Sequence, residues 1–204
     1  MKIQKDIFIN RRQILSRKIK DNSCVIIGTN PLQARSKDTN YSYRPDSDFY
    51  YLTGFSEPHA LLVMIKSSGV LTSILFCEER DSFKEMWEGE IIGTKRAKSL
   101  YGLCDAVAID IVDTQMPKIL AGLDRVYFSM SSLSKLLPKI NHWNEGVSKT
   151  RYQSSAPREF IDIDFLIHEM RIIKDKYEID LMQKSADIAA TAHIIAMKKC
   201  KPGM

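Results

Sequence analysis

Five short apolar runs, separated by polar and helical segments, constrain the fold of this chain more than any other feature. They are Cys24–Gly28, Ala60–Lys66, Leu71–Cys77, Ala106–Val112 and Arg125–Met130. The turn sequence Ser67-Ser68-Gly69 joins the second run to the third, which predicts a hairpin. The later runs alternate with segments of helical period, as is typical of parallel strands buried on both faces. This order predicts an α/β fold, with a mixed β-sheet flanked by helices.

Helical spacing accounts for much of the remaining chain. We expect helices over Ile7–Lys20, Lys95–Tyr101, Thr114–Ala121 and Ser132–Trp143. Gly102 and Gly122 follow two of them, where a C-terminal glycine is favoured. Asp113 or Thr114 is expected to cap the third helix. Phe8, Leu15 and Ile19 share one face of the first helix and are expected to be buried.

The last quarter of the chain has a different composition. Residues 146–158 are rich in Ser, Thr, Lys and Arg and are expected to form a linker or exposed loop. Asp175 and Glu178 have the spacing of a capping box, which predicts that a long helix begins there. Its apolar stripe comprises Ile179, Met182, Ala186, Ala189, His193 and Met197. We therefore expect an α/β domain over residues 1–158, followed over residues 159–204 by a connecting segment and one long helix.

Charge is distributed unevenly along the chain. The net charge is +5. Residues 1–20 contain seven Lys and Arg residues against Asp6 alone, so the rest of the chain is close to neutral. A nucleic-acid interface would be expected to carry basic groups interleaved with aromatic ones, or in a known motif. A charge run on one amphipathic helix is more typical of a solvated helix face, so we expect no nucleic-acid partner.

The cysteines and the apolar runs indicate where in the cell the protein is expected to reside. Cys24, Cys77, Cys104 and Cys200 are widely spaced and form no C-x-x-C pair, which indicates reduced, buried thiols in the cytoplasm. No apolar run approaches the roughly 20 residues of a membrane span, so we expect no membrane partner. The first residues lack the apolar core of a secretory signal.

The block from Asp38 to Ile65 places a polar, aromatic loop beside strand-like segments. Residues 41–48 are rich in Tyr and Asp, whereas residues 49–55 and 60–65 are apolar. We expect Phe49–Thr53, like Ala60–Lys66, to form a strand. A polar loop on rigid strands is a common way to build a site. An ordinary edge loop over a core would have the same composition, and both interpretations stay open.

Metal and catalytic motifs are weak in this sequence. His59, His142, His168 and His193 do not have the spacing of H-E-x-x-H, and we interpret each as a surface or core residue. Asp46 and Asp48, and Asp162 and Asp164, form D-x-D pairs. In a strand such a pair could share a metal, but Asp46 follows Pro45, which favours a turn. An enzyme site built from Asp38, Asp46 and Asp48 would lack a base, a nucleophile and an oxyanion group at recognisable spacing.

Trp87 stands out because it lies in the polar stretch EMWEGEIIG. It could cap the edge of the core. Alternatively, its amphipathic ring could be offered to a ligand or a protein partner.

Four stretches together resemble the N-terminal domain of aminopeptidase P, the Xaa-Pro aminopeptidases of the pita-bread metallopeptidase group. They are RRQIL (11–15), RSKDTNYSYRPDSDFYYLTGFSEPHALLV (35–63), FCEERDSFKEMWEGEIIG (76–93) and HEMRIIKDKYEIDLMQKSADIAATAH (168–193). The second stretch is the most specific, and the order of all four strengthens the match. The resemblance covers essentially the whole chain.

The resemblance implies a peptidase that removes an N-terminal residue preceding proline. It implies a dinuclear Mn²⁺ site whose Asp, His and Glu ligands lie in a C-terminal domain. The sequence ends near the entry to that domain, so the long helix within residues 159–204 is expected to be the first helix of the catalytic domain. No residue here is expected to be a catalytic residue or a metal ligand. We therefore expect this chain alone to bind no cofactor and to be inactive.

The resemblance also implies a role for two residues and for partners. By position, Asp38 and Trp87 match residues that form a wall of the substrate site in a neighbouring subunit. Self-association or a catalytic-domain partner is expected, with a proline-containing peptide as the substrate of the whole enzyme. The family's W-x-G-x-R-x-G segment has a basic residue where this chain has Glu90-Ile91, so the role of that basic residue is not carried over to this chain. A rival interpretation is a stand-alone binding module that pairs through Trp87 and the long helix.

Overall fold

The computed structural model describes residues 5–149 and 155–204, which form two compact units, residues 1–167 and 168–204. The first unit contains a six-stranded sheet in the order β4-β3-β2-β1-β5-β6. The strands are β1 (Ser23–Gly28), β2 (Leu61–Ser67), β3 (Val70–Cys77), β4 (Asp105–Ala108), β5 (Arg125–Phe128) and β6 (Glu159–Asp162). β2 runs antiparallel to both of its neighbours, and the other pairings are parallel. The predicted mixed α/β sheet is therefore confirmed.

Strand β1 lies at the centre of the sheet and is buried on both faces. Its residues Cys24 and Ile26 join the core cluster formed with α5 (Val112–Leu120) and α6 (Leu133–Ser148). Side chains alternate along a strand, so Val25 and Ile27 point to the opposite face. All four are at most 4% exposed, which explains why this strand has a continuous apolar run.

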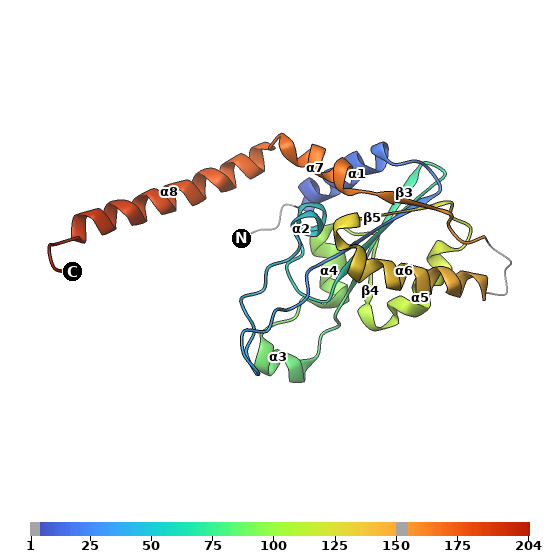
Figure 1. Cartoon of the computed structure of the whole chain (residues 1–204), viewed down its shortest axis with the longest axis horizontal. Coiled ribbons are helices and arrows are strands. Elements are labelled where there is room, and N and C mark those ends of the chain that lie inside the picture. Colours follow the sequence, from blue (N-terminus) through green and yellow to red (C-terminus); the bar gives the residue numbers. More distant parts are fainter. Residues whose placement is uncertain (1–4, 150–154) are drawn as a thin grey trace. The chain divides into compact units, whose positions relative to one another are not determined.

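Helices cover both faces of the sheet (Figure 1). α5 and α6 pack together against one face. The opposite face is covered by α1 (Lys5–Lys18), α2 (Ser47–Thr53) and α4 (Gly93–Tyr101), which contact one another through α1. As predicted, Phe8, Leu15 and Ile19 are buried, at 3%, 0% and 3% exposure.

The basic residues of α1 are not all on a solvated face, which corrects the interpretation of this charge run. Arg11 and Arg12 are only 5% and 2% exposed. The Arg11 guanidinium lies 4.0 Å from the centre of the Tyr51 ring, and Arg12 donates to three main-chain carbonyls. Burial lowers the pKa of Arg12 to about 10. These two cations hold the fold together and are not part of a surface charge patch.

Residues 49–53 form a helix, so the prediction of a strand there was wrong. Asp46 caps α2, since its Oδ1 accepts from the backbone N–H groups of Asp48 and Phe49 at 2.9 and 3.0 Å. Gly54, with φ +70°, ends the helix in the left-handed conformation. The apolar run is buried on one side of a short helix, and its composition alone did not distinguish this from a strand.

Other boundaries also differ from the sequence expectations. β4 ends at Ala108 and continues as a 3-10 helix over Ile109–Ile111. α5 begins at Val112 with no side-chain cap, and its C-cap is Ala121 and not Gly122. Asp113 instead accepts from Nε1 of Trp143 at 2.7 Å.

The segment expected to be a linker is partly helical. α6 continues to Ser148, within that segment, and part of the segment lies outside the described residues. The expected boundary after residue 158 stays a prediction, and β6 just beyond it pairs with β5.

The second unit is dominated by α8 (Lys176–Lys199), while α7 (Asp164–Ile172) contains the division between the units. The predicted capping box is confirmed: Glu178 N donates to Asp175 Oδ1 at 2.9 Å, and Asp175 N donates to Glu178 Oε2 at 3.0 Å. Ile179 and Met197 of the predicted stripe are 54% and 70% exposed. Within the described residues, none of the helices is long and apolar enough to cross a membrane.

All four cysteines are free, but only two are buried. Cys24 and Cys77 lie in the sheet, and burial raises the pKa of both thiols. Cys104 and Cys200 are exposed. The expectation that all four thiols are buried was therefore wrong for the two that lie outside the strands.

Candidate functional site

Trp87 lies on a short helix that presents apolar side chains to solvent. This helix, α3 (Ser82–Glu88), carries Phe83, Met86 and Trp87, which are 71%, 73% and 79% exposed. We call these three side chains the α3 platform. Trp87 therefore does not cap the core, because its ring lies outside the hydrophobic interior. Clustered large apolar side chains on a surface mark interaction sites more often than isolated ones do.

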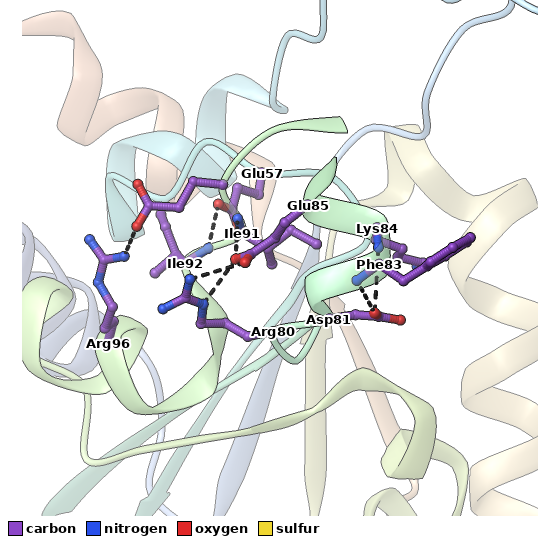
Figure 2. A network of polar contacts seen from close by, with 10 residues as sticks. Glu57, Arg80, Asp81, Phe83, Lys84, Glu85, Ile91, Ile92 and Arg96 are labelled. Atoms are coloured by element: carbon purple, nitrogen blue, oxygen red, sulfur yellow. Dashed lines mark hydrogen bonds and ion pairs between the residues drawn. The ribbon is translucent and has the colours of Figure 1, made fainter. Parts of the chain in front are cut away.

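The helix that carries the platform is fixed at both ends. Asp81 is its N-cap, and its Oδ1 accepts from Phe83 N at 2.9 Å and from Lys84 N at 3.4 Å (Figure 2). Gly89 follows with φ +91°, and its N–H donates to the Glu85 carbonyl. A side-chain N-cap satisfies main-chain donors that have no partner inside the helix. The exposed ring of Trp87 therefore sits on a helix with satisfied termini.

Glu85 connects α3 to the segment that follows it. Its carboxylate receives two hydrogen bonds from Arg80, at 2.9 and 3.0 Å, and Oε1 also accepts from Ile91 N at 3.1 Å (Figure 2). The Arg80 guanidinium lowers the pKa of Glu85, and the carboxylate raises the pKa of Arg80 in turn. Bidentate arginine–carboxylate pairs fix orientation as well as contributing energy. Glu85 thus fixes the turn after Trp87.

Glu57 holds the next residue of the same segment from a distant loop. Its Oε1 accepts from Ile92 N at 2.8 Å (Figure 2). Partial burial raises the pKa of Glu57. Glu90 forms an ion pair with Arg96, and Ile91 is 7% exposed. At the positions that depart from the family pattern, this chain therefore has a surface ion pair and a buried aliphatic side chain.

Asp38 lies in a separate, exposed loop. Arg35 N donates to the Thr39 carbonyl at 2.8 Å, and Ala34 and Asn40 form an isolated bridge that closes the turn. Asp38 Oδ1 accepts from Ser36 Oγ at 3.1 Å. Within the described part of the chain, no hydrogen bond or ion pair joins Asp38 to Trp87. Both side chains reach the surface, and the structure does not link them directly.

The aspartate pairs serve the local fold. The turn interpretation of Asp46 is confirmed by its capping of α2. Asp162 Oδ1 accepts from Met130 N at 3.1 Å and from Asp164 N at 3.2 Å. Near Trp87, Glu85 and Glu90 are engaged by arginines. These two carboxylates are therefore neutralised by cations and do not fit the donor set of a dinuclear manganese site.

A cavity of about 430 Å³ lies at another place, where the parallel strands end. Its lining includes Gly28 from β1, Glu78 after β3, Ser129 after β5 and Ile163 after β6. These residues are far apart in sequence and meet only because parallel strands share a carboxyl edge. Sequence reasoning therefore missed this cavity, and no local motif could have revealed it.

Comparisons with known proteins agree with this architecture. The family model "Aminopeptidase P, N-terminal domain" matches residues 8–127. An Xaa-Pro aminopeptidase of Escherichia coli K12 is 37% identical over an alignment of 204 positions, which covers 99% of this chain and 46% of that protein. The low-pH form of E. coli aminopeptidase P superposes with a TM-score of 0.94 at 37% identity, covering 100% of this chain and 47% of the other.

A third match comes from another bacterium. Proline aminopeptidase P II from Yersinia pestis superposes with a TM-score of 0.92 at 34% identity, covering 98% of this chain and 47% of that one. The chain thus spans about half the length of the relatives that it matches. The family model, the relative and the fold all point the same way, so the chain belongs to the aminopeptidase P family and carries that family's N-terminal domain.

Proposed function

We propose that these residues are the N-terminal part of a manganese-dependent Xaa-Pro aminopeptidase, a hydrolase that removes N-terminal residues preceding proline. The family membership and the length of the match support this proposal. The role of this part is to shape and assemble the site, while the metal-based chemistry belongs to the other half of the enzyme. A cytoplasmic location is part of the proposal, and the four free thiols support it.

The observation that carries the proposal is the exposure of Trp87 on a fixed helix. A ring that is 79% exposed next to Phe83 and Met86 contributes little to the stability of this unit. Glu57 and Glu85 nevertheless hold the segment after it through the main-chain N–H groups of Ile92 and Ile91. Such a platform suits a rigid contact that loses little conformational entropy on binding. We propose that Trp87, with Asp38, forms a wall of the substrate site in a neighbouring subunit of an oligomer.

A second candidate is a stand-alone module that binds a full-length or catalytic-domain partner. The apolar residues along α8 favour it, because Ile188 and Met197 are 72% and 70% exposed in addition to the α3 platform. Both candidates use the same platform, but only the first requires a peptidase active site beside it.

Hydrolysis of an Xaa-Pro peptide tests the catalytic part of the proposal. The 204-residue chain with added Mn²⁺ should release no N-terminal residue, because in this proposal the ligands of the catalytic metal ions belong to the other half of the enzyme. Turnover that a chelator abolishes would contradict this expectation.

Trp87→Ala tests the role of the platform. Sedimentation analysis should show weaker association, by about tenfold or more if the ring is a central contact. The melting temperature should change little, since the ring is mostly exposed. Val70→Ala is the matched control, because Val70 is also exposed, at 66%, but lies at the β2–β3 hairpin. Unchanged association in Trp87→Ala would remove Trp87 from the proposed interface.

A further inference from the structure

The cavity at the carboxyl edge of the sheet has the size and position of a ligand site. Its volume of about 430 Å³ falls in the usual range of small-molecule pockets. In open α/β sheets, ligands bind in the crevice outside the carboxyl ends of the parallel strands. Here the ends of β1, β3, β4, β5 and β6 all contribute to the lining.

The inner surface of the cavity is largely apolar, and its Trp143 ring is held in place by a hydrogen bond. Its aliphatic and aromatic lining comprises Ile27, Leu61, Ile109, Val112, Leu136, Trp143, Ile163 and Ile167. Trp143 is 0% exposed, and its Nε1 donates to Asp113 at 2.7 Å, which fixes the ring. A floor of this kind favours an apolar chain or ring over a bare inorganic ion.

The polar part of the lining is predominantly acidic. Five carboxylates, those of Asp46, Asp48, Glu78, Asp110 and Asp164, contribute to it, against one lysine, Lys139, and one histidine, His59. Lys84 offsets Glu78 from 3.1 Å, and the N-termini of α2, α5 and α7 each supply about half a positive charge. These contributions do not cancel five carboxylates. The cavity keeps an excess of negative charge and therefore favours a cation.

One carboxylate oxygen of Asp164 is an acceptor with no donor. The other oxygen, Oδ2, accepts from Ser129 Oγ at 2.9 Å. Oδ1 is buried, and no group in the described part of the chain donates to it. A buried acceptor left without a hydrogen bond is costly, and such groups in native proteins call for an explanation. A ligand N–H group in the cavity would satisfy this oxygen.

We propose that this cavity binds a small organic cation, namely a protonated amine carried on an apolar chain or ring. The ammonium group pairs with Asp164 and its acidic neighbours, and the apolar part packs against Trp143 and the aliphatic floor. The proposal is independent of the peptidase function, because it uses neither Trp87 nor Asp38.

The two tryptophans of the chain provide a direct readout. Trp87→Phe removes the exposed indole and leaves Trp143, in the cavity wall, as the single tryptophan. In this background, 2-phenylethylamine at pH 7 should change the Trp143 emission in a saturable way, and calorimetry should give the same dissociation constant. The neutral 2-phenylethanol and the anionic 3-phenylpropionate are matched in size, and each should bind at least about tenfold more weakly. Raising the salt concentration should weaken the binding of the amine and leave the binding of the neutral alcohol unchanged.

Two substitutions test where the amine binds. Asp164→Asn keeps an acceptor for Ser129 but removes the charge, and should weaken amine binding about tenfold or more. Gly28→Ala adds a methyl group to the lining at ordinary contact distances, 3.6 Å from Leu61 Cδ1 and 3.8 Å from Leu136 Cδ2, so the fold should tolerate it. Gly28→Ala should weaken the binding of both phenylethylamine and phenylethanol, because the added methyl group takes up space that both ligands need. Asp124→Asn, an exposed acid outside the lining, is the control and should leave binding unchanged.

Several results would overturn the proposal. Equal binding of the amine and the alcohol would show that the carboxylates do not select charge. Amine binding unaffected by both Asp164→Asn and Gly28→Ala would place the ligand elsewhere. If MnCl₂ alone changed the Trp143 emission and the amine did not, the cavity would be a metal site and not a site for organic cations.

Discussion

Arg12 donates from Nη2 to the carbonyl oxygen of Gly102, at 2.6 Å and across 90 residues of sequence. The same guanidinium donates to the carbonyls of Tyr101 and Leu52, at 2.9 and 2.8 Å. One side chain of α1 thus satisfies carbonyls at the ends of both α2 and α4. Helix C-terminal carbonyls have no partner within their own helix, so this arginine acts as a shared C-cap.

Replacing Arg12 should destabilise the first unit strongly. Arg12→Met keeps much of the side-chain volume but leaves three carbonyls without a donor, and should lower the free energy of unfolding by about 3 kcal/mol or more. Urea denaturation followed by circular dichroism measures the loss. Arg17→Met is the matched control, because Arg17 is exposed on the same helix, and it should change stability by less than about 0.5 kcal/mol. Equal effects of the two substitutions would show that the buried hydrogen bonds do not stabilise the fold.

Gly54 should be sensitive to the addition of a single methyl group. Its φ is +70°, and a Cβ there would lie 2.4 Å from Cε2 of Phe8. Gly69→Ala separates the two effects, because Gly69 has φ +75° but a Cβ added to it would meet no atom within 4 Å. We expect Gly69→Ala to cost about 1 kcal/mol from the backbone alone and Gly54→Ala about 2–4 kcal/mol. Thermal or urea unfolding measures the loss of stability in each variant. Equal losses in Gly54→Ala and Gly69→Ala would show that the contact with Phe8 adds nothing to the cost.

Glu85 should control the order of the segment after Trp87. In Glu85→Ala, the Ile91 N–H loses its acceptor and Arg80 loses its partner. Hydrogen exchange of the Ile91 amide should become about five- to tenfold faster, while amides of β1 should keep their protection. Glu79→Ala removes a neighbouring exposed carboxylate and serves as the control. Unchanged exchange at Ile91 would show that Glu85 does not hold this segment.

The two carboxylates that anchor the platform, Glu85 and Glu57, have pKa values shifted in opposite directions and should therefore affect stability oppositely as the pH changes. The pKa of Glu85 is lowered by Arg80, whereas that of Glu57 is raised by burial. Glu85 therefore contributes stability that is present above its ordinary value of 4.5 and is lost as the pH falls through its lower folded pKa. For Glu57 the sign is reversed, because its folded state binds the proton more tightly; stability falls as the pH rises from 4.5 through its higher folded pKa.

Carbon-detected NMR titration of the glutamate carboxyl groups measures both values. Arg80→Gln should move the pKa of Glu85 back towards 4.5 and should leave that of Glu57 above it. A Glu85 pKa that stays low in Arg80→Gln would assign the shift to the Ile91 N–H instead.

The sequence singled out Trp87 and Asp38 as candidate site residues. It did not show that Trp87 is exposed or which residues hold the segment after it. Trp87 stands out as an aromatic residue in a polar stretch, and the resemblance to aminopeptidase P pairs it with Asp38. The anchors Glu57 and Glu85 have no sequence signal, because their acceptor role depends on main-chain N–H groups that a fold places beside them. The Glu57 contact spans 35 residues.

The sequence by itself determined the features that depend on near neighbours. The capping box of Asp175 and Glu178, the glycine after Tyr101 and the β2–β3 hairpin are formed by residues a few positions apart, so their hydrogen bonds follow from local spacing. The apolar periods also determined the mixed α/β sheet, since a buried strand must be apolar wherever it lies.

The tertiary structure alone decided what depends on distant contacts. It buried Arg11 and Arg12, which on charge alone belong at the surface, by supplying carbonyls from α2 and α4. It folded residues 49–53 as a helix against α1, although their apolar character suits a strand equally well. It also brought together the strand ends that line the cavity. In each case the deciding partner is tens of residues away, and free energy gained there outweighs the local preference of the chain.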